Sequence, residues 1–254
     1  RKRFGQHFLV DRGVIDAIVR AIMPGARERI VEIGPGTGAL TRPLLSRVER
    51  LHVVEIDRDI VARLKREFSP EKLLIHEADA LRFDFGALFA GEKMRLVGNL
   101  PYNISTPLLF HLGRYADRVT DMHFMLQKEV VDRLVAKPRT VDYGRLSVML
   151  QYRYVIDRLF CVAPESFDPP PKVDSSVVRM IPRPPGDLRV KNEARFSRLV
   201  QAAFSRRRKM LRNNLEELSG KIDLPDFGIE PTARAEELSV DDYARMSNAL
   251  DFRV

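Results

Sequence analysis

The sequence contains a single cysteine and no long apolar run, and both absences exclude classes of protein. The lone Cys161 excludes a disulfide framework and a metal site built from cysteines. No apolar run reaches the roughly eighteen residues that a membrane-spanning helix needs. The basic residues 1–14 contain no apolar core of the kind that a secretory signal has. We therefore expect a cytoplasmic protein in a reducing compartment, with no membrane partner and no metal.

The length and composition are those of an ordinary globular protein. The 254 residues are 44% hydrophobic and 31% charged, a balance that excludes disorder, collagen and coiled coil. A chain of this length can bury enough surface for one full-sized domain and a smaller one. No feature of the sequence indicates an oligomer, and we expect a monomer.

Positive charge is concentrated in one band of the chain. The 43 Lys and Arg residues outnumber 35 Asp and Glu residues, for a formal net charge of +8. Residues 179–212 hold eleven basic and two acidic residues, whereas residues 213–254 hold four basic and ten acidic residues. A basic band of this kind favours a polyanionic partner such as nucleic acid.

Short apolar runs alternate with helical patterns in the first part of the chain. The runs that read as strands cover residues 29–33, 51–56, 73–75, 95–97 and 122–126. This alternation predicts a doubly wound α/β domain with a parallel sheet. Two later runs, Tyr154–Val162 and Ser176–Ile181, are predicted to complete the sheet as an antiparallel pair.

Capping residues mark where helices are predicted to begin. Asp11 and Asp57 each precede a helical pattern, and Ser105-Thr106 precede Pro107. After the proline-rich residues 182–186 the pattern is purely helical, with an apolar face over 196–204 and another over 211–218. We predict an α/β domain over residues 1–185 and a small all-helical domain over residues 186–254.

A glycine-rich segment, Glu32-Ile-Gly-Pro-Gly-Thr-Gly38, follows the first predicted strand and opens a helix. Such glycines let the backbone approach a ligand outside the carboxyl end of the strand. Glu32 repels phosphate and attracts a cation. Glu55, which ends the next strand, is placed to bind ribose hydroxyls, and Asp79 is placed to contact a base edge. A ribose and a base without a phosphate describe S-adenosylmethionine better than NAD.

A Rossmann-like domain that binds no nucleotide is the alternative, because any α/β protein can turn on glycines.

The residues Asn99-Leu-Pro-Tyr102, which end the fourth strand, allow two interpretations as well. One is a simple turn, since Asn and Pro are turn residues. The other is a site for the exocyclic amine of adenine, a poor nucleophile because its lone pair is delocalised into the ring.

In that second interpretation each residue has a task. The side-chain carbonyl of Asn99 and the main-chain carbonyl of Leu100 accept hydrogen bonds from the amine and favour its pyramidal, nucleophilic form. Pro101 stiffens the turn that presents these acceptors. Tyr102 offers a face on which the base can stack, worth ~1–3 kcal/mol.

Four segments together resemble the ribosomal RNA adenine N6-dimethyltransferases. They are Gln6-His-Phe-Leu9, Glu32–Gly38, Asn99-Leu-Pro-Tyr-Asn-Ile-Ser105 and Phe167-Asp-Pro-Pro-Pro-Lys-Val-Asp-Ser175. The resemblance covers essentially the whole chain and is nearest to the bacterial branch that modifies small-subunit RNA. It implies a Rossmann-like class I S-adenosylmethionine-dependent methyltransferase domain, with S-adenosyl-L-methionine as cofactor, followed by a helical RNA-binding domain.

The resemblance also implies roles for individual residues. Tyr102 and Phe167 would sandwich a flipped adenine, and Asn99 would contact its amine. The residues expected around the target are Asn99, Leu100, Pro101, Tyr102 and Phe167. Those expected to bind the cofactor are Gln6, His7, Leu9, Glu32, Gly34, Gly36, Glu55, Ile56, Asp79, Ala80 and Asn99.

The reaction needs little acid–base chemistry, because the sulfonium methyl group is already electrophilic. The protein has to hold the amine nitrogen in line with the methyl group at about 3–3.5 Å and to exclude water. We therefore interpret His52, His76 and His111 as structural rather than as bases.

The basic band suggests where RNA binds. Contacts with phosphate are expected at Arg206, Arg207, Arg208, Lys209 and Arg212. The alternative is that these charges only solvate a helix. The resemblance implies dimethylation of two adjacent adenosines in a terminal hairpin of small-subunit rRNA, on a late assembly particle. Other functions left open are methylation of large-subunit rRNA, of DNA or of protein glutamine, and a non-catalytic role in ribosome assembly.

Overall fold

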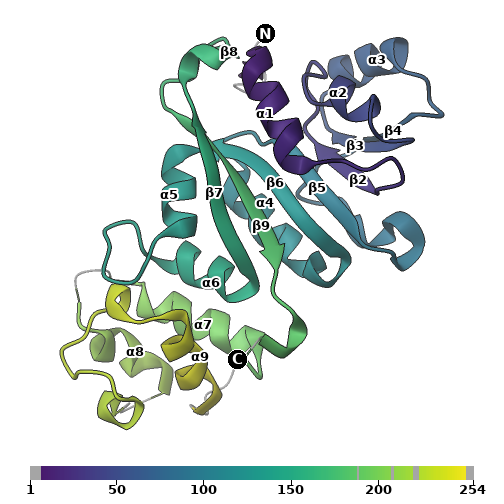
Figure 1. The fold of residues 1–254 in the computed structure, drawn as a ribbon. Coiled ribbons are helices and arrows are strands. Elements are labelled where there is room, and N and C mark those ends of the chain that lie inside the picture. The colour runs from purple at the N-terminus through teal and green to yellow at the C-terminus, as the bar shows by residue number, and fades with distance from the viewer. Residues whose placement is uncertain (1–6, 188, 207–208, 220–222, 250–254) are drawn as a thin grey trace. The chain divides into compact units, whose positions relative to one another are not determined.

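The computed structural model describes residues 7–187, 189–206, 209–219 and 223–249, and Figure 1 traces their path. The chain forms two compact units. The first contains the residues up to Val131 together with Ile156–Pro182, and the second contains Asp132–Val155 with the residues from Arg183 onward. The predicted domains assign methyl transfer to residues 1–185 and RNA binding to residues 186–254. That division of function stays a prediction.

A seven-stranded sheet with the order β4–β3–β2–β5–β6–β9–β7 organises the first unit (Figure 1). The strands are β2 (Ile30–Ile33), β3 (Leu51–Glu55), β4 (Leu73–Glu77), β5 (Met94–Asn99), β6 (Val119–Gln127), β7 (Tyr154–Val162) and β9 (Ser175–Pro182). The strands from β4 to β6 pair in parallel, whereas β9 pairs antiparallel with β6. The predicted α/β fold, with β7 and β9 as neighbours that complete the sheet, is confirmed.

The sheet order determines where a ligand can bind. The chain moves outward from β2 through β3 to β4 and then returns to place β5 on the other side of β2. Ligands of open α/β sheets bind outside the carboxyl ends of the strands at such a reversal. The site is therefore expected where β2, β3 and β5 end.

Helices connect these strands, and two of their predicted caps are confirmed. The helices of this part are α1 (Arg12–Ile22), α2 (Thr41–Leu45), α3 (Arg58–Glu67) and α4 (Ser105–Leu112), and α5 (Lys128–Val135) begins in it and ends in the second unit. Asp11 accepts a hydrogen bond from the Val14 amide at 3.2 Å, and Asp57 accepts one from the Asp59 amide at 2.9 Å. The start of α4 differs from the prediction, because Ser105 is already helical and its hydroxyl donates to the Pro101 carbonyl at 3.0 Å.

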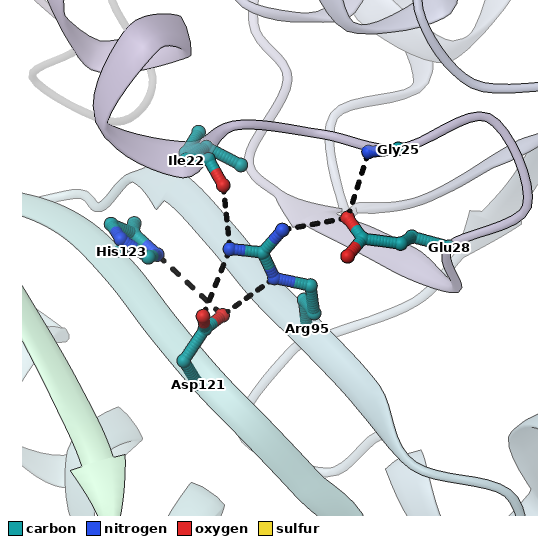
Figure 2. Close-up of polar contacts among 6 residues, drawn as sticks. All are labelled: Ile22, Gly25, Glu28, Arg95, Asp121 and His123. Atoms are coloured by element: carbon teal, nitrogen blue, oxygen red, sulfur yellow. Dashed lines mark hydrogen bonds and ion pairs between the residues drawn. The ribbon is translucent and has the colours of Figure 1, made fainter.

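A mostly buried polar cluster joins β5 and β6 near the start of each strand, at the opposite end of β5 from Asn99; Figure 2 shows its side chains. The Arg95 guanidinium donates to both carboxylate oxygens of Asp121 at 2.8 and 2.9 Å, and to Glu28 at 2.6 Å. It also donates to the Ile22 carbonyl at the end of α1, at 2.6 Å. The cluster thus ties the segment after α1 to the strand that presents Asn99.

The second unit has its own apolar core, to which α6 (Arg145–Arg153), α7 (Glu193–Ala203), α8 (Leu211–Ser219) and α9 (Val240–Ala249) contribute. The predicted apolar face of α7 is buried in it, including Phe196 and Leu199. The rings of Tyr152 and Phe196 lie 4.7 Å apart. This packing explains why residues 132–155, which the sequence assigned to the first domain, cluster with the second unit.

Two features are absent from the part of the chain that the structure describes. No helix there is long and apolar enough to cross a bilayer. No three His, Cys, Asp or Glu side chains gather there in a way that would hold a metal ion.

Candidate active site

A cavity of about 270 Å³ lies where β2, β3 and β5 end. The first three of the four motif segments contribute residues to its wall, and the last, residues 167–175, contributes none. The predicted site residues in its wall are His7, Leu9, Glu32, Gly34, Gly36, Glu55, Ile56, Asp79, Asn99, Leu100, Pro101 and Tyr102. The fold thus brings together residues that lie more than ninety positions apart in the sequence, since the Asn99 side chain is hydrogen-bonded to the His7 carbonyl.

The glycine loop after β2 has a backbone that requires glycine. Gly34, Gly36 and Gly38 have φ values of +68°, +52° and +84°, in the left-handed region that side chains disfavour. A Cβ on Gly36 would also come within 3.2 Å of the Phe8 ring. Close packing and turn geometry therefore both favour glycine in the cavity wall.

Glu32 is a buried carboxylic acid beside this loop. It is 2% exposed, and its Oε2 accepts a hydrogen bond from the Thr41 hydroxyl at 2.6 Å. Burial raises the pKa of Glu32 to about 7; the Thr41 hydrogen bond opposes this rise, and the charge of Glu55 adds to it. The group therefore titrates near neutrality, and a cationic ligand would favour its ionised form.

Glu55 is oriented by the backbone that follows it. Its Oε1 accepts hydrogen bonds from the amides of Ile56 and Asp57 at 2.8 and 2.9 Å. Burial nevertheless raises the pKa of Glu55 above its usual range, although these bonds oppose the rise. The backbone of Gly36 in the glycine loop gives this carboxylate a further hydrogen bond, which also opposes the rise. A carboxylate held in this way at the end of β3 is placed to accept from the hydroxyls of a ribose.

Two neighbours of Glu55 suit the rest of a nucleoside. Ile56 is 50% exposed and offers an apolar surface in the cavity wall. Asp79 Oδ1 accepts from the Leu81 amide at 2.9 Å, which orients the carboxylate toward one end of the site. A carboxylate for the ribose, an apolar surface for the ring and an acceptor for the base amine fit the adenosine part of S-adenosylmethionine.

The turn from Asn99 to Tyr102 is held from three directions. The Leu100 amide donates to the Met125 carbonyl on β6 at 3.1 Å. The Asn99 Nδ2 donates to the His7 carbonyl at 3.2 Å, so that its Oδ1 is the oxygen left to accept from a ligand. The Tyr102 hydroxyl is hydrogen-bonded to Ser175 at 2.7 Å.

Two segments distant in sequence meet beside this turn. Strand β1 (Phe8–Leu9) pairs antiparallel with β8 (Phe167–Asp168). The His7 Nδ1 donates to the Pro169 carbonyl at 2.7 Å, and its ring stacks on Tyr102 with centroids 5.8 Å apart. This pairing brings the first and last motif segments to one end of the cavity.

Some predicted site residues do not lie in the cavity wall. Phe167 is 3% exposed and packs in the apolar core, so its ring does not face Tyr102 across the cavity. Ala80 is buried beside Asp79 and does not line the cavity either. Gln6, Arg207 and Arg208 lie outside the described residues. The other predicted RNA contacts, Arg206, Lys209 and Arg212, are exposed in the second unit.

The cavity wall also contains residues that the sequence analysis missed. These are Phe8, Pro35, Thr37, Ala39, Leu40, Leu81, Asn103 and Ile104. Most of them lie within or beside the quoted motifs, and only adjacency to a predicted ligand could have identified them. The three histidines interpreted as structural, His52, His76 and His111, are absent from the cavity wall.

The strand order, the left-handed glycine loop and the acids at successive strand ends define a class I S-adenosylmethionine-dependent methyltransferase. Its Asn-Leu-Pro-Tyr turn is suited to an amine as the methyl acceptor. Residues 1–251 match the ribosomal RNA adenine dimethylase family, and the chain belongs to that family.

Relatives and solved structures agree with this assignment. The chain is 58% identical to the ribosomal RNA small subunit methyltransferase A of Dechloromonas aromatica, covering 98% of this chain and 97% of the relative. It is 60% identical to the protein of the same name from Laribacter hongkongensis, covering 98% and 95%. A dimethyladenosine transferase from Plasmodium falciparum has a TM-score of 0.79 at 26% identity, covering 93% and 94%. The 23S rRNA methyltransferase ErmE has a TM-score of 0.72 at 25% identity, covering 96% and 99%.

Proposed function

We propose that this protein transfers methyl groups from S-adenosylmethionine to the N6 amines of two adjacent adenosines in small-subunit rRNA, and that it acts in the cytoplasm on a late assembly particle. The observation that carries the proposal is the orientation of Asn99. Its amide nitrogen is engaged by the His7 carbonyl, and its amide oxygen remains for the N–H groups of an incoming amine. The names of relatives about 60% identical over nearly the whole chain support the small subunit as substrate.

When bound, S-adenosylmethionine supplies an electrophilic methyl group. Glu55 and Asp79 would hold its adenosine part, and ionised Glu32 would favour its positive charge. The Asn99 side-chain carbonyl and the Leu100 carbonyl would accept hydrogen bonds from the N–H groups of the target amine. This directs the nitrogen lone pair toward the methyl group, and Tyr102 holds the base by stacking. In the transfer the N–C bond would form as the S–C bond of the sulfonium breaks, S-adenosylhomocysteine would be the leaving group, and the surplus proton of the amine would pass to water.

The second unit would hold the RNA. Its exposed Arg206, Lys209 and Arg212 belong to the basic band, and cations of this kind neutralise phosphates. Contacts with phosphate do not depend on the RNA sequence. The cavity of the first unit and the shape of the RNA would therefore determine which adenosine is methylated.

Methylation of purified ribosomal subunits tests the proposal. Small subunits from cells that lack the modification would be incubated with labelled S-adenosylmethionine and the wild-type protein, and the RNA digested to nucleosides. We expect N6,N6-dimethyladenosine with the wild-type protein and none with Asn99→Ala. A matched control is Asn192→Ala, which removes the same amide from the cap of α7 in the second unit.

The other outcomes identify the other functions. Transfer to large-subunit RNA alone would contradict the small-subunit assignment. Tight binding of the particle without transfer to either subunit would favour a non-catalytic assembly factor.

A further inference from the structure

Among the residues that the structure describes, the Tyr102 hydroxyl is hydrogen-bonded to the side chain of Ser175, at 2.7 Å. Ser175 is fully buried at the start of β9. Its Cα is in register with Gln127 at the end of β6. The hydrogen bond therefore runs from a ring in the cavity wall to a rigid position on the sheet, 73 residues further along the chain.

The same end of the sheet anchors the turn a second time. The Leu100 amide is bonded to the Met125 carbonyl on β6, the strand beside β9. The backbone of the turn and the tip of the Tyr102 ring are thus attached to neighbouring strands. A ring attached at both ends has less freedom to swing about its side-chain torsions than one attached only through its backbone.

We propose that Ser175 is a positioning residue for methyl transfer, which acts through Tyr102 by holding its ring where the target adenine stacks. The side chain is not among the residues that line the cavity, so its route to the target base is through the Tyr102 ring. Ser175 should therefore affect the binding and methylation of the target adenine. The affinity for the cofactor should not depend on it. The inference rests on the proposed function for the identity of the substrate alone.

The neighbouring serine provides a matched control. Ser176 is the next residue of β9 and is equally buried, but its hydroxyl lies 3.5 Å from the Cys161 sulfur instead. Ser175→Ala and Ser176→Ala therefore delete the same atom from the same strand on opposite sides. Tyr102→Phe removes the other partner of the hydrogen bond and keeps the stacking ring.

Kinetics on small subunits form the first test. Ser175→Ala should lower kcat/KM for the RNA substrate about fivefold, the effect of one hydrogen bond, with the dissociation constant for S-adenosylmethionine unchanged. Tyr102→Phe should have the same effect, and the double variant should lose no more than either single variant. Additive losses, or loss of cofactor binding together with activity, would overturn the inference.

A spectroscopic readout makes the result independent of the substrate. In protein with ¹³C-labelled tyrosine rings, the Tyr102 resonances are those that Tyr102→Phe removes. They should shift or broaden in Ser175→Ala and stay unchanged in Ser176→Ala. If they do so while the wild-type protein methylates no subunit, the proposed function fails and the positioning contact stands. Unchanged resonances in Ser175→Ala would overturn the inference whatever the substrate is.

Discussion

At the scale of single residues, the site contains a carboxylic acid, Glu32, whose burial disfavours its ionised form. Glu32 lies in the cavity wall, and its pKa is raised from 4.5 to about 7. The folded state binds the Glu32 proton more tightly than the unfolded chain does. The protonated carboxyl therefore stabilises the folded state, and its contribution to the free energy of unfolding is fully present below pH 4.5. It is lost as the pH rises through about 7.

Glu32→Gln should therefore remove a pH dependence of stability. Without cofactor, the Glu32 contribution should make the wild-type protein about 1 kcal/mol less stable at pH 8 than at pH 6. Glutamine cannot ionise, so the variant should show a smaller difference between the two pH values. Urea unfolding at each pH measures it. An equal difference in both proteins would show that Glu32 does not titrate in this range.

Arg95 is a second residue whose environment makes a clear prediction. Arg95→Met leaves Asp121 without its guanidinium partner in a mostly buried cluster (Figure 2). Loss of a buried partner should cost about 3 kcal/mol in the free energy of unfolding. Arg29→Met, which breaks an exposed pair with Glu92, should cost less than about 1 kcal/mol. Chemical denaturation measures both, and equal losses would contradict a special role for the cluster.

At the scale of elements, the spacing of β2 and β5 depends on one glycine. A Cβ on Gly98 would lie 2.3 Å from the Ile33 carbonyl oxygen, which is backbone and cannot rotate away. The two strands carry the glycine loop and Asn99 at their ends. Their close approach therefore links the stability of the sheet to the geometry of the site.

Gly98→Ala should force these strands apart. We expect a loss of about 3 kcal/mol in stability and weaker binding of S-adenosylmethionine, measured by denaturation and calorimetry. Gly186→Ala is the control, because a Cβ there would meet nothing within 4 Å. A Gly98→Ala protein with wild-type stability would mean that the sheet relaxes more easily than this contact suggests.

At the scale of the whole molecule, charge distribution should govern RNA affinity. If Lys209 and Arg212 each neutralise a phosphate, replacing either by Gln should reduce the magnitude of the negative slope of log K against log salt by about 1. Arg27→Gln changes the net charge equally at an exposed position of the first unit and should leave the slope unchanged. Filter binding at several salt concentrations distinguishes a local contact from an effect of total charge.

The sequence by itself determined the local features of this protein. Alternation of apolar runs predicts the strands, and capping aspartates predict the starts of α1 and α3, because these signals arise within a few residues of backbone. The glycine loop, Glu55 and Asn99 could be assigned to the carboxyl edge of a parallel sheet for the same reason. The motifs were specific enough to indicate the family.

Only the tertiary structure decided which distant segments meet. The bonds from Asn99 to His7 and from Tyr102 to Ser175 join residues 92 and 73 positions apart, and no local pattern encodes such pairs. Packing also put the Phe167 ring in the core and residues 132–155 in the second unit. A local pattern shows that a side chain is apolar, but the arrangement of the surrounding elements determines what it packs against.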